Sequence, residues 1–183
     1  MVAVEKLNLE KIFPSRIRFE ITSKCSFRCK FCYLRENTWK MRDLSLTKIK
    51  KIIDKITKFP VKILFEGGEP FERKDIFEIL EYAKRKGASV GIDTNGWFLK
   101  KNDLKKLKKI GVDKINISFY GACSKTHDWH TQHRGSFEHN IQLLRDSKKI
   151  NLVADAAFTL TKLNFFEFFK FYLLVKKLGV NKI

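Results

Sequence analysis

Short apolar segments alternate with longer segments in which apolar residues recur every three or four positions. The short segments predict β-strands at residues 16–22, 61–66, 89–93, 114–120 and 152–160. The longer segments predict helices at residues 46–56, 74–86, 137–147 and 165–178, together with a short helix that ends at Ile110. This alternation is typical of βαβ units, which build a parallel sheet. The pattern therefore predicts an α/β fold.

The predicted helices end at glycines, and one helix-to-strand segment occurs twice. Gly87, Gly111 and Gly179 each follow a helix at the position where a left-handed cap is expected. Residues 108–115 (KKIGVDKI) are echoed by residues 176–183 (KKLGVNKI). Because the first copy leads into the fourth strand, the second is expected to lead into a sixth. We therefore expect a partial (β/α)6 TIM-like barrel with parallel strands, truncated at the start of strand six.

Strand alternation also predicts which side chains line the inside of this barrel. Successive side chains of a strand point to opposite faces, so Ile17, Phe19 and Ile21 are expected to pack under the helices. The other face carries polar residues on all five strands: Arg18, Glu20, Thr22, Glu66, Asp93, Asn116, Ser118, Tyr120 and Asp155. An ordinary eight-stranded barrel fills its lumen with branched apolar side chains. The polar set predicts instead a water-accessible interior that binds a ligand, unless some of these residues are strand ends that meet solvent.

Length and composition favour one soluble domain. A chain of 183 residues with 44% hydrophobic residues is large enough for a single core. We expect a lead-in at residues 1–15 and one core domain at residues 16–183, incomplete at its carboxyl end. No segment approaches the roughly 18 apolar residues that span a bilayer, and the first residues lack the apolar stretch of a secretory signal. The expected location is therefore the cytoplasm, without a membrane partner.

The chain carries a formal net charge of +18, from 38 Lys and Arg against 20 Asp and Glu. Such an excess suggests a polyanionic partner such as RNA. Most of the positive residues are lysines, however, and they crowd the outer faces of predicted helices, as in residues 100–109. Nucleic-acid readers usually interleave arginine with aromatic residues on one face. A solvated, lysine-rich surface is therefore the favoured interpretation, with nucleic acid as the alternative partner.

Three of the four cysteines lie within eight residues, directly after the first predicted strand. In a chain without an export signal, such a group indicates a metal site rather than a disulfide framework. Cys25, Cys29 and Cys32 offer three soft thiolates to one centre. A structural zinc would need a fourth ligand, and Cys123 is far away in the sequence. Three ligands on a 4Fe-4S cubane leave one iron open for another molecule.

The C-x3-C-x2-C spacing, with Phe31 before the last cysteine and Tyr33 after it, resembles the signature of the radical S-adenosylmethionine (radical SAM) superfamily. The resemblance implies that Cys25, Cys29 and Cys32 hold a 4Fe-4S cluster whose open iron binds the amino and carboxylate groups of S-adenosylmethionine (SAM). It also implies reductive cleavage of SAM to a 5'-deoxyadenosyl radical, which abstracts hydrogen from a substrate. An electron donor such as flavodoxin or ferredoxin is then implied as a partner.

Further segments resemble motifs of this family in the family's order, each near the end of a predicted strand or the start of a helix. Residues 67–70 (GGEP) are similar to the motif that holds the amino group of SAM; glycines let a backbone approach a ligand closely, and an acid suits an ammonium group. Other matching segments are residues 94–96 (TNG), 118–121 (SFYG), 134–137 (RGSF) and 159–164 (TLTKLN), although Tyr120 replaces the usual acid. The SAM-binding residues implied by the resemblance are Gly67, Gly68, Glu69, Pro70, Asn95, Ser118, Arg134 and Asn164. No catalytic residue is implied.

The style of these motifs is most similar to the branch of the family that modifies peptides, proteins or cofactor precursors. The expected activity is therefore that of a radical SAM enzyme core acting on a peptide, protein or small-molecule substrate. Two alternatives stay open. An RNA-modifying member would account for the charge of +18, and a non-catalytic, truncated cluster-binding fragment would account for a chain that stops as strand six begins.

Three smaller features have plainer interpretations. His127, His130 and His133 recur in a polar connection and are expected to be solvated, with a second metal or a substrate contact as alternatives. Cys123 is expected to be a structural thiol rather than a redox group. The aromatic residues at 165–172 are expected to pack over the barrel rather than against a partner or a membrane.

Overall fold

The computed structural model describes residues 13–36 and 42–180, and within them helices cover a single five-stranded sheet. The strands are β1 (Arg16–Thr22), β2 (Lys62–Gly67), β3 (Ser89–Thr94), β4 (Lys114–Phe119) and β5 (Ala154–Phe158). They lie in the order β1-β2-β3-β4-β5, and every neighbouring pair is parallel. The predicted α/β fold with parallel strands in barrel order is confirmed, although β5 is shorter than predicted. The expected sixth strand falls on residues 181–183, outside the described part of the chain.

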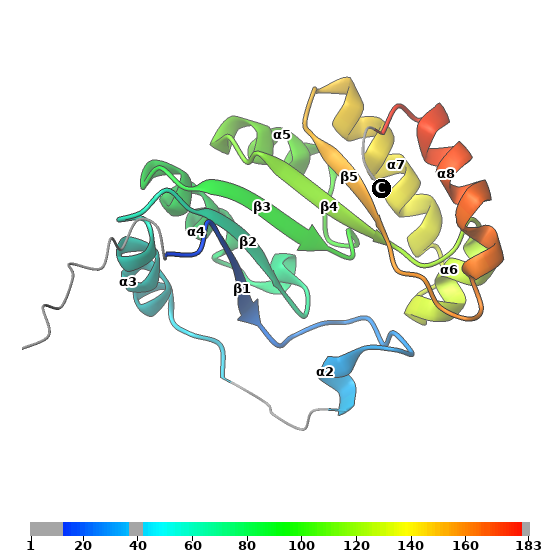
Figure 1. Cartoon of the computed structure of the whole chain (residues 1–183), viewed down its shortest axis with the longest axis horizontal. Coiled ribbons are helices and arrows are strands. Elements are labelled where there is room, and N and C mark those ends of the chain that lie inside the picture. Colours follow the sequence, from blue (N-terminus) through cyan, green and yellow to red (C-terminus); the bar gives the residue numbers. More distant parts are fainter. Residues whose placement is uncertain (1–12, 37–41, 181–183) are drawn as a thin grey trace, which may run out of the picture.

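The helices follow the strands along the chain, as βαβ units require. They are α2 (Tyr33–Glu36), α3 (Leu46–Ile56), α4 (Ile76–Arg85), α5 (Lys101–Ile110), α6 (Ser124–Thr131), α7 (Ser136–Lys149) and α8 (Phe168–Lys177), with the short 3-10 helices η1 (Pro70–Glu72) and η2 (Phe165–Glu167). Figure 1 shows α4, α5, α7 and α8 on one side of the curved sheet. The segment after β1 runs past the ends of the other strands toward α6 before it turns into α2.

The face of the sheet under these helices is apolar, as the alternation predicts. Its fully buried side chains include Ile63, Phe65, Ile92, Ile117 and Phe119. On β1, Ile21 is buried, and Ile17 and Phe19 pack partly buried against the same core. Burying a side chain of this size contributes roughly 1.5–3 kcal/mol. A shift of one residue in strand pairing would exchange these side chains for polar ones, so the core determines the register.

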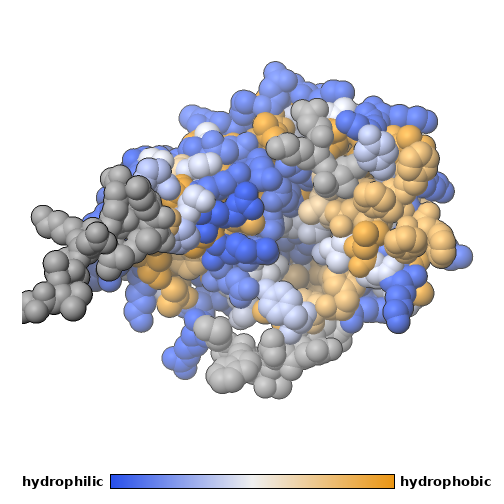
Figure 2. Space-filling view, viewed as in Figure 1, coloured by the Kyte–Doolittle hydropathy of each residue, from blue (hydrophilic) through white to orange (hydrophobic). Residues whose placement is uncertain are grey.

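The opposite face of the sheet carries a network of charged and polar side chains. Arg18 donates to both carboxylate oxygens of Glu66, at 2.7 and 2.5 Å, and lies 4.0 Å from Asp93. Asn116, the neighbour of Asp93 in the parallel register, donates a hydrogen bond to it. In Figure 2 the middle of the molecule, over the strands, is accordingly hydrophilic. The predicted polar face is confirmed for these strands.

The connection after β4 differs from the prediction. Part of the expected polar connection forms α6, in which His127 and His130 are 0% and 2% exposed. The buried side of this helix consists of His127, His130 and Thr131, so no apolar stripe marked it in the sequence. The expectation that these two histidines are solvated is therefore wrong.

The aromatic segment around α8 packs only in part. Phe171 and Val175 are fully buried, whereas Phe165, Phe166 and Phe169 are 61%, 92% and 68% exposed. Figure 2 shows the resulting hydrophobic surface on the right, over α8. The expectation that the whole segment packs over the barrel is wrong, because a helix turns only one stripe toward the sheet. Within the described residues, no helix is both long and apolar enough to cross a membrane.

Candidate functional site

The three predicted metal-ligating cysteines lie on one loop after β1, residues 23–32, which we call the cysteine loop. Cys29 is buried, Cys25 and Cys32 are partly exposed, and all three are free thiols. The backbone N–H of Cys32 donates to the carbonyl oxygen of Cys29 at 3.2 Å, which forms a turn at the end of the loop. Burial raises the pKa of Cys25 to about 11. Its thiol therefore has to release a proton when a metal centre binds.

The glycines of the GGEP segment lie against the end of β1 and the start of the cysteine loop. The backbone N–H of Gly68 donates to the carbonyl oxygen of Thr22 at 2.8 Å, and that of Glu69 donates to Lys24 at 2.7 Å. A Cβ atom on Gly68 would overlap the carbonyl oxygen of Lys24, and one on Gly67 would overlap that of Thr22. Glycine is required here because the two backbones approach so closely.

The side chain of Glu69 is enclosed by the protein, with an exposed fraction of 0%. Its carboxylate accepts hydrogen bonds from the backbone N–H of Phe71 at 3.0 Å, the Thr94 hydroxyl at 2.8 Å and the backbone N–H of Asn95 at 2.7 Å. Burial raises the pKa of this carboxyl to about 7, against the effect of the three hydrogen bonds. Pro70, also buried, begins η1 directly after it. The carboxylate thus joins the end of β2 to the end of β3.

Asn95 connects this arrangement to the cysteines. Its side-chain Nδ2 lies 3.7 Å from the Sγ of Cys25, while its Oδ1 accepts a hydrogen bond from the backbone N–H of Trp97 at 2.9 Å. A hydrogen bond to sulfur favours the thiolate and acts on the pKa of Cys25 in the direction opposite to burial. The predicted TNG segment therefore reaches the predicted metal ligand.

Helix α6 holds the other side of the cysteine loop. The backbone N–H of Lys30 donates to the carbonyl oxygen of His130 at 3.0 Å. The ring of Phe27 stacks on His133 with centroids 4.4 Å apart, and Phe31 packs against Tyr120 at 4.7 Å. Burial lowers the pKa of His133. These contacts place the loop between the GGEP segment and α6.

The ring of His130 also links α6 to the end of β5. Its Nδ1 lies 2.8 Å from the carbonyl oxygen of Thr126, which makes Nδ1 the donor. Its Nε2 then accepts from the hydroxyl of Thr161 at 3.0 Å. His127, in contrast, accepts from the backbone N–H of Tyr120 at 3.2 Å, and burial lowers its pKa to about 4. The ring of His127 is therefore a neutral structural group at neutral pH.

The predicted residues at β4, β5 and α7 have different surroundings. Asn164 is fully buried; it donates to the carbonyl oxygens of Tyr120 at 3.0 Å and Thr159 at 2.8 Å, and so joins the ends of β4 and β5. The carbonyl oxygen of Ser118 accepts from Asn140 at 3.1 Å. Arg134 is exposed just before α7. The structure therefore brings Glu69 and Asn95 to the cysteine loop, whereas the side chain of Asn164 is bonded to backbone groups.

A buried arginine, Arg73, holds the end of β1 just before the cysteine loop, and no sequence motif indicated this role. Arg73 donates to the carbonyl oxygens of Ile21 at 2.9 Å and Leu44 at 3.1 Å, and pairs with Asp75 at 2.8 Å. Asp43 accepts from the hydroxyl of Thr22 at 3.0 Å. The partners of Arg73 and Asp43 include segments far from them in the chain, so no local spacing could indicate these roles.

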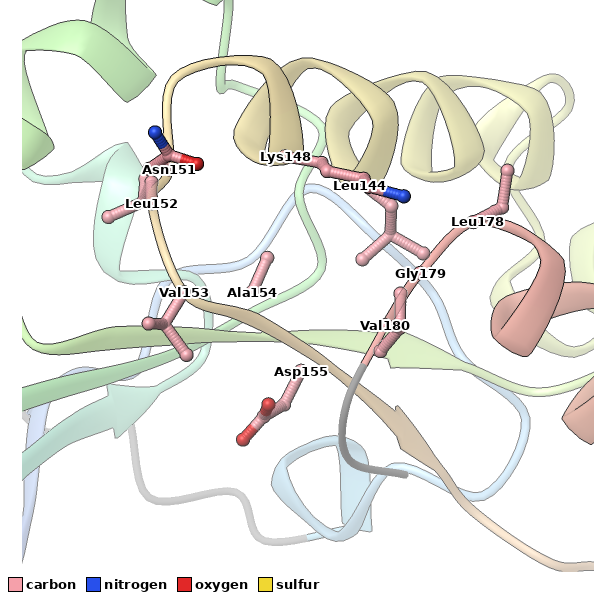
Figure 3. Close-up of a pocket in the computed structure, with 10 residues that line it drawn as sticks. All are labelled: Leu144, Lys148, Asn151, Leu152, Val153, Ala154, Asp155, Leu178, Gly179 and Val180. Atoms are coloured by element: carbon pink, nitrogen blue, oxygen red, sulfur yellow. The ribbon is translucent and has the colours of Figure 1, made fainter.

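One hollow lies beside the cysteine loop, and another lies at the start of β5. One is lined by Cys25 with its neighbours Lys24 and Ser26, together with Arg42 and Glu72. The other, in Figure 3, lies where β5 begins, between the end of α7 and the segment after α8, and Asp155 lies in it. In TIM-like barrels the sites lie at the carboxyl ends of the strands. The first hollow, beside Cys25, therefore belongs to the candidate site.

The donor set fits an iron–sulfur cluster. Three thiols on one loop are soft ligands for iron, and the N–H of Asn95 directed at Cys25 is the kind of outer contact that tunes such clusters. Within residues 13–36 and 42–180, no group of three His, Cys, Asp or Glu side chains is placed to hold a single metal ion. A cubane binds each thiolate to a different iron, so its ligands stand farther apart than those of one ion.

Comparisons with known sequences agree with this site. Residues 19–174 match the sequence model of the family described as the Radical SAM superfamily. The chain is 31% identical over 169 residues to the AdoMet-dependent heme synthase of Methanosarcina barkeri, covering 91% of this chain and 48% of that protein. It is 33% identical over 170 residues to the probable GTP 3',8-cyclase of Saccharolobus solfataricus, covering 91% of this chain and 54% of that protein. The chain thus spans about half the length of these curated relatives.

Solved structures share the fold. SuiB of Streptococcus suis bound to SAM matches with a TM-score of 0.82 at 19% identity, covering 92% of this chain and 39% of SuiB. The structure of anSMEcpe with bound AdoMet matches with a TM-score of 0.73 at 15% identity, covering 88% of this chain and 48% of the other. A family match over most of the chain, together with relatives above 30% identity, leads to one conclusion. The chain belongs to the radical SAM superfamily.

Proposed function

We propose that this chain is the core of a radical SAM enzyme and binds a 4Fe-4S cluster through Cys25, Cys29 and Cys32. The observation that carries the proposal is the placement of these thiols on one loop, bonded by its backbone to the GGEP segment and approached by Asn95. When bound, the cluster supplies the electron that cleaves SAM to methionine and a 5'-deoxyadenosyl radical, which takes a hydrogen atom from the substrate.

The other residues of the site are proposed either to contact SAM or to hold the surrounding strand ends in place. The backbone of Gly67 and Gly68 is proposed to contact the amino-acid end of SAM; their missing side chains let this segment lie against the end of β1 and the cysteine loop. The guanidinium of Arg134 suits its carboxylate. Pro70, Asn95 and Ser118 complete the proposed contacts. Glu69 and Asn164 are proposed to act by holding strand ends together, because their side chains are bonded to protein groups.

The substrate is proposed to enter over the polar face of the sheet, where Arg18, Glu66, Asp93 and Asn116 form a hydrogen-bonded network. We propose a peptide, a protein or a small cofactor precursor. The names of the similar proteins support this range: two are a heme synthase and a GTP 3',8-cyclase, and SuiB is also known bound to the precursor peptide SuiA. A flavodoxin or ferredoxin is the proposed electron donor.

Reconstitution of the cluster under anaerobic conditions tests the proposal. The protein with dithionite and SAM is expected to release 5'-deoxyadenosine, measured by liquid chromatography with mass spectrometry. Bound iron and sulfide without cleavage of SAM would favour the non-catalytic fragment. Failure to bind iron and sulfide at all would overturn the proposal.

Single cysteine variants test the ligand assignment. Cys25→Ala, Cys29→Ala and Cys32→Ala should each abolish the visible absorption of the cluster, because a cubane held by two thiolates is labile. Cys123→Ala is the matched control and should keep the absorption, since its thiol lies 3.7 Å from the hydroxyl of Thr126 at the start of α6. Loss of the cluster in Cys123→Ala would contradict the three-ligand assignment.

A further inference from the structure

One side of α6 presents an exposed tryptophan between two lysines. Trp129 is 44% exposed although it is a large aromatic residue. Lys125 lies four residues before it on the same helix, so both side chains share one face, and Lys125 is exposed. The Nζ of Lys30 lies 3.7 Å from the centre of the Trp129 ring, a cation–π contact that brings a second positive charge to the same place. We call Lys30, Lys125 and Trp129 the Trp129 surface.

This surface borders the cysteine loop directly. Lys30 follows Cys29 in the chain, and its backbone N–H bonds to the carbonyl oxygen of His130, the residue after Trp129. The loop and the helix are therefore joined at the point where Lys30 meets Trp129. Figure 1 shows the segment after β1 reaching across to α6. A protein resting on Trp129 would lie beside the backbone of a proposed cluster ligand.

The acidic residue of α6 is turned toward α7. Asp128 accepts hydrogen bonds from the backbone N–H groups of Gly135 at 2.7 Å and Phe137 at 3.0 Å, at the start of α7. Asp128 keeps its negative charge, but its carboxylate is held at the start of α7, so the charged side chains of the Trp129 surface itself are Lys30 and Lys125.

We propose that the Trp129 surface is the docking site of an acidic one-electron carrier protein that reduces the cluster. The inference rests on the proposed function, because only a reducible cluster needs such a partner. A central aromatic residue with flanking cations is typical of a protein interface, and complementary charge steers the encounter. Electron transfer slows steeply with distance, so a carrier gains from landing beside Cys29.

A polyanion such as RNA would also meet positive charge here, but the geometry favours the protein carrier. Single strands bind to several aromatic side chains in succession, along a groove that follows the backbone. The Trp129 surface has one aromatic residue, and its ring is covered on one side by Lys30. The Trp129 surface also borders the cysteine loop, which carries the proposed cluster ligands.

The test compares two sources of electrons. Reconstituted holoprotein forms 5'-deoxyadenosine either with reduced flavodoxin, which is an acidic protein, or with dithionite, which needs no docking surface. Lys30→Glu with Lys125→Glu should lower the flavodoxin-supported rate at low salt on the order of tenfold, and should leave the dithionite-supported rate unchanged. Trp129→Ala should lower the flavodoxin-supported rate in the same way.

A charge-matched control uses Lys105→Glu with Lys109→Glu on α5, which change the net charge equally at another exposed site. This control variant should retain the flavodoxin-supported rate of the wild type. Added salt should lower the flavodoxin-supported rate of the wild type, and should lower that of the Lys30→Glu and Lys125→Glu double variant less. Equal flavodoxin rates in both double variants would overturn the proposal. A parallel loss with dithionite would overturn it too, because the surface would then serve the fold or the cluster itself.

Two further outcomes separate the proposals. If wild-type protein forms no 5'-deoxyadenosine with dithionite, the proposed function fails, and the docking proposal with it. The Lys30→Glu and Lys125→Glu double variant could instead keep the wild-type flavodoxin-supported rate but lose binding to transfer RNA at low salt. In that case the surface binds nucleic acid and the carrier proposal is wrong.

Discussion

The backbone N–H of Asn95 donates to the carboxylate of Glu69 at 2.7 Å. The side chain of the same asparagine lies 3.7 Å from the Sγ of Cys25. Glu69 therefore acts on a proposed cluster ligand through Asn95, without touching the sulfur. Its other partners, Phe71 and Thr94, hold the carboxylate in place from both strand ends.

Glu69→Gln should destabilise the protein by about 1–3 kcal/mol and lower its iron content after reconstitution. Both carboxylate oxygens accept hydrogen bonds, and an amide NH2 in place of one of them would face a donor. Urea unfolding and iron analysis measure the two effects. Glu81→Gln, at an exposed position of α4, is the control and should match wild type. Unchanged stability in Glu69→Gln would show that the carboxylate is not held as described.

Gly68→Ala should disturb the cysteine loop more than the fold as a whole. A Cβ atom there would overlap the carbonyl oxygen of Lys24, and backbone cannot yield as a flexible side chain does. Overpacking of this kind costs about 1–3 kcal/mol. Hydrogen exchange of residues 23–32 should become faster, and cluster absorption should fall. Gly87→Ala also strains a left-handed residue, but no atom lies within 4 Å of the added Cβ; it should lower the free energy of unfolding by about 1–2 kcal/mol and change neither the exchange of residues 23–32 nor the cluster absorption.

The contribution of His127 to the stability of the protein should fall as the pH drops from 7 to 5, whereas Glu69, with its pKa raised to about 7, contributes in the opposite direction. Burial holds the folded-state pKa of His127 at about 4, below the ordinary value of 6.5. Between these values the unfolded chain binds more protons, so acid favours unfolding. The contribution lost from pH 7 to pH 5 is on the order of 2 kcal/mol.

His127→Gln provides the comparison for this pH dependence. Its side-chain oxygen can accept the backbone N–H of Tyr120 that the imidazole Nδ1 accepts in the wild type, and it does not titrate. Urea unfolding at pH 7, 6 and 5 should show the free energy of unfolding of the wild type falling relative to that of the variant as the pH drops, because Glu69 is present in both proteins. The same pH dependence in both proteins would contradict a buried neutral histidine.

Local periodicity was sufficient for most of the fold. Strands β1 to β4 lie within one residue of their predicted bounds, and α3 coincides with its prediction, because each turns an apolar face to the core. Helix α6 was not predicted because its buried side consists of His127, His130 and Thr131 and therefore shows no apolar stripe. Polar side chains are buried there because each finds partners in the folded protein, such as Thr161 for His130.

The sequence by itself determined the parallel α/β order, the polar face of the sheet and the three thiols of the family signature. These depend on spacing within one element or loop and on the order of the elements along the chain. Only the tertiary structure decided what the polar motif residues bond to. Glu69 and Asn164 are bonded inside the protein, and Lys30 meets His130, because the packed sheet brings together segments that are far apart in the chain.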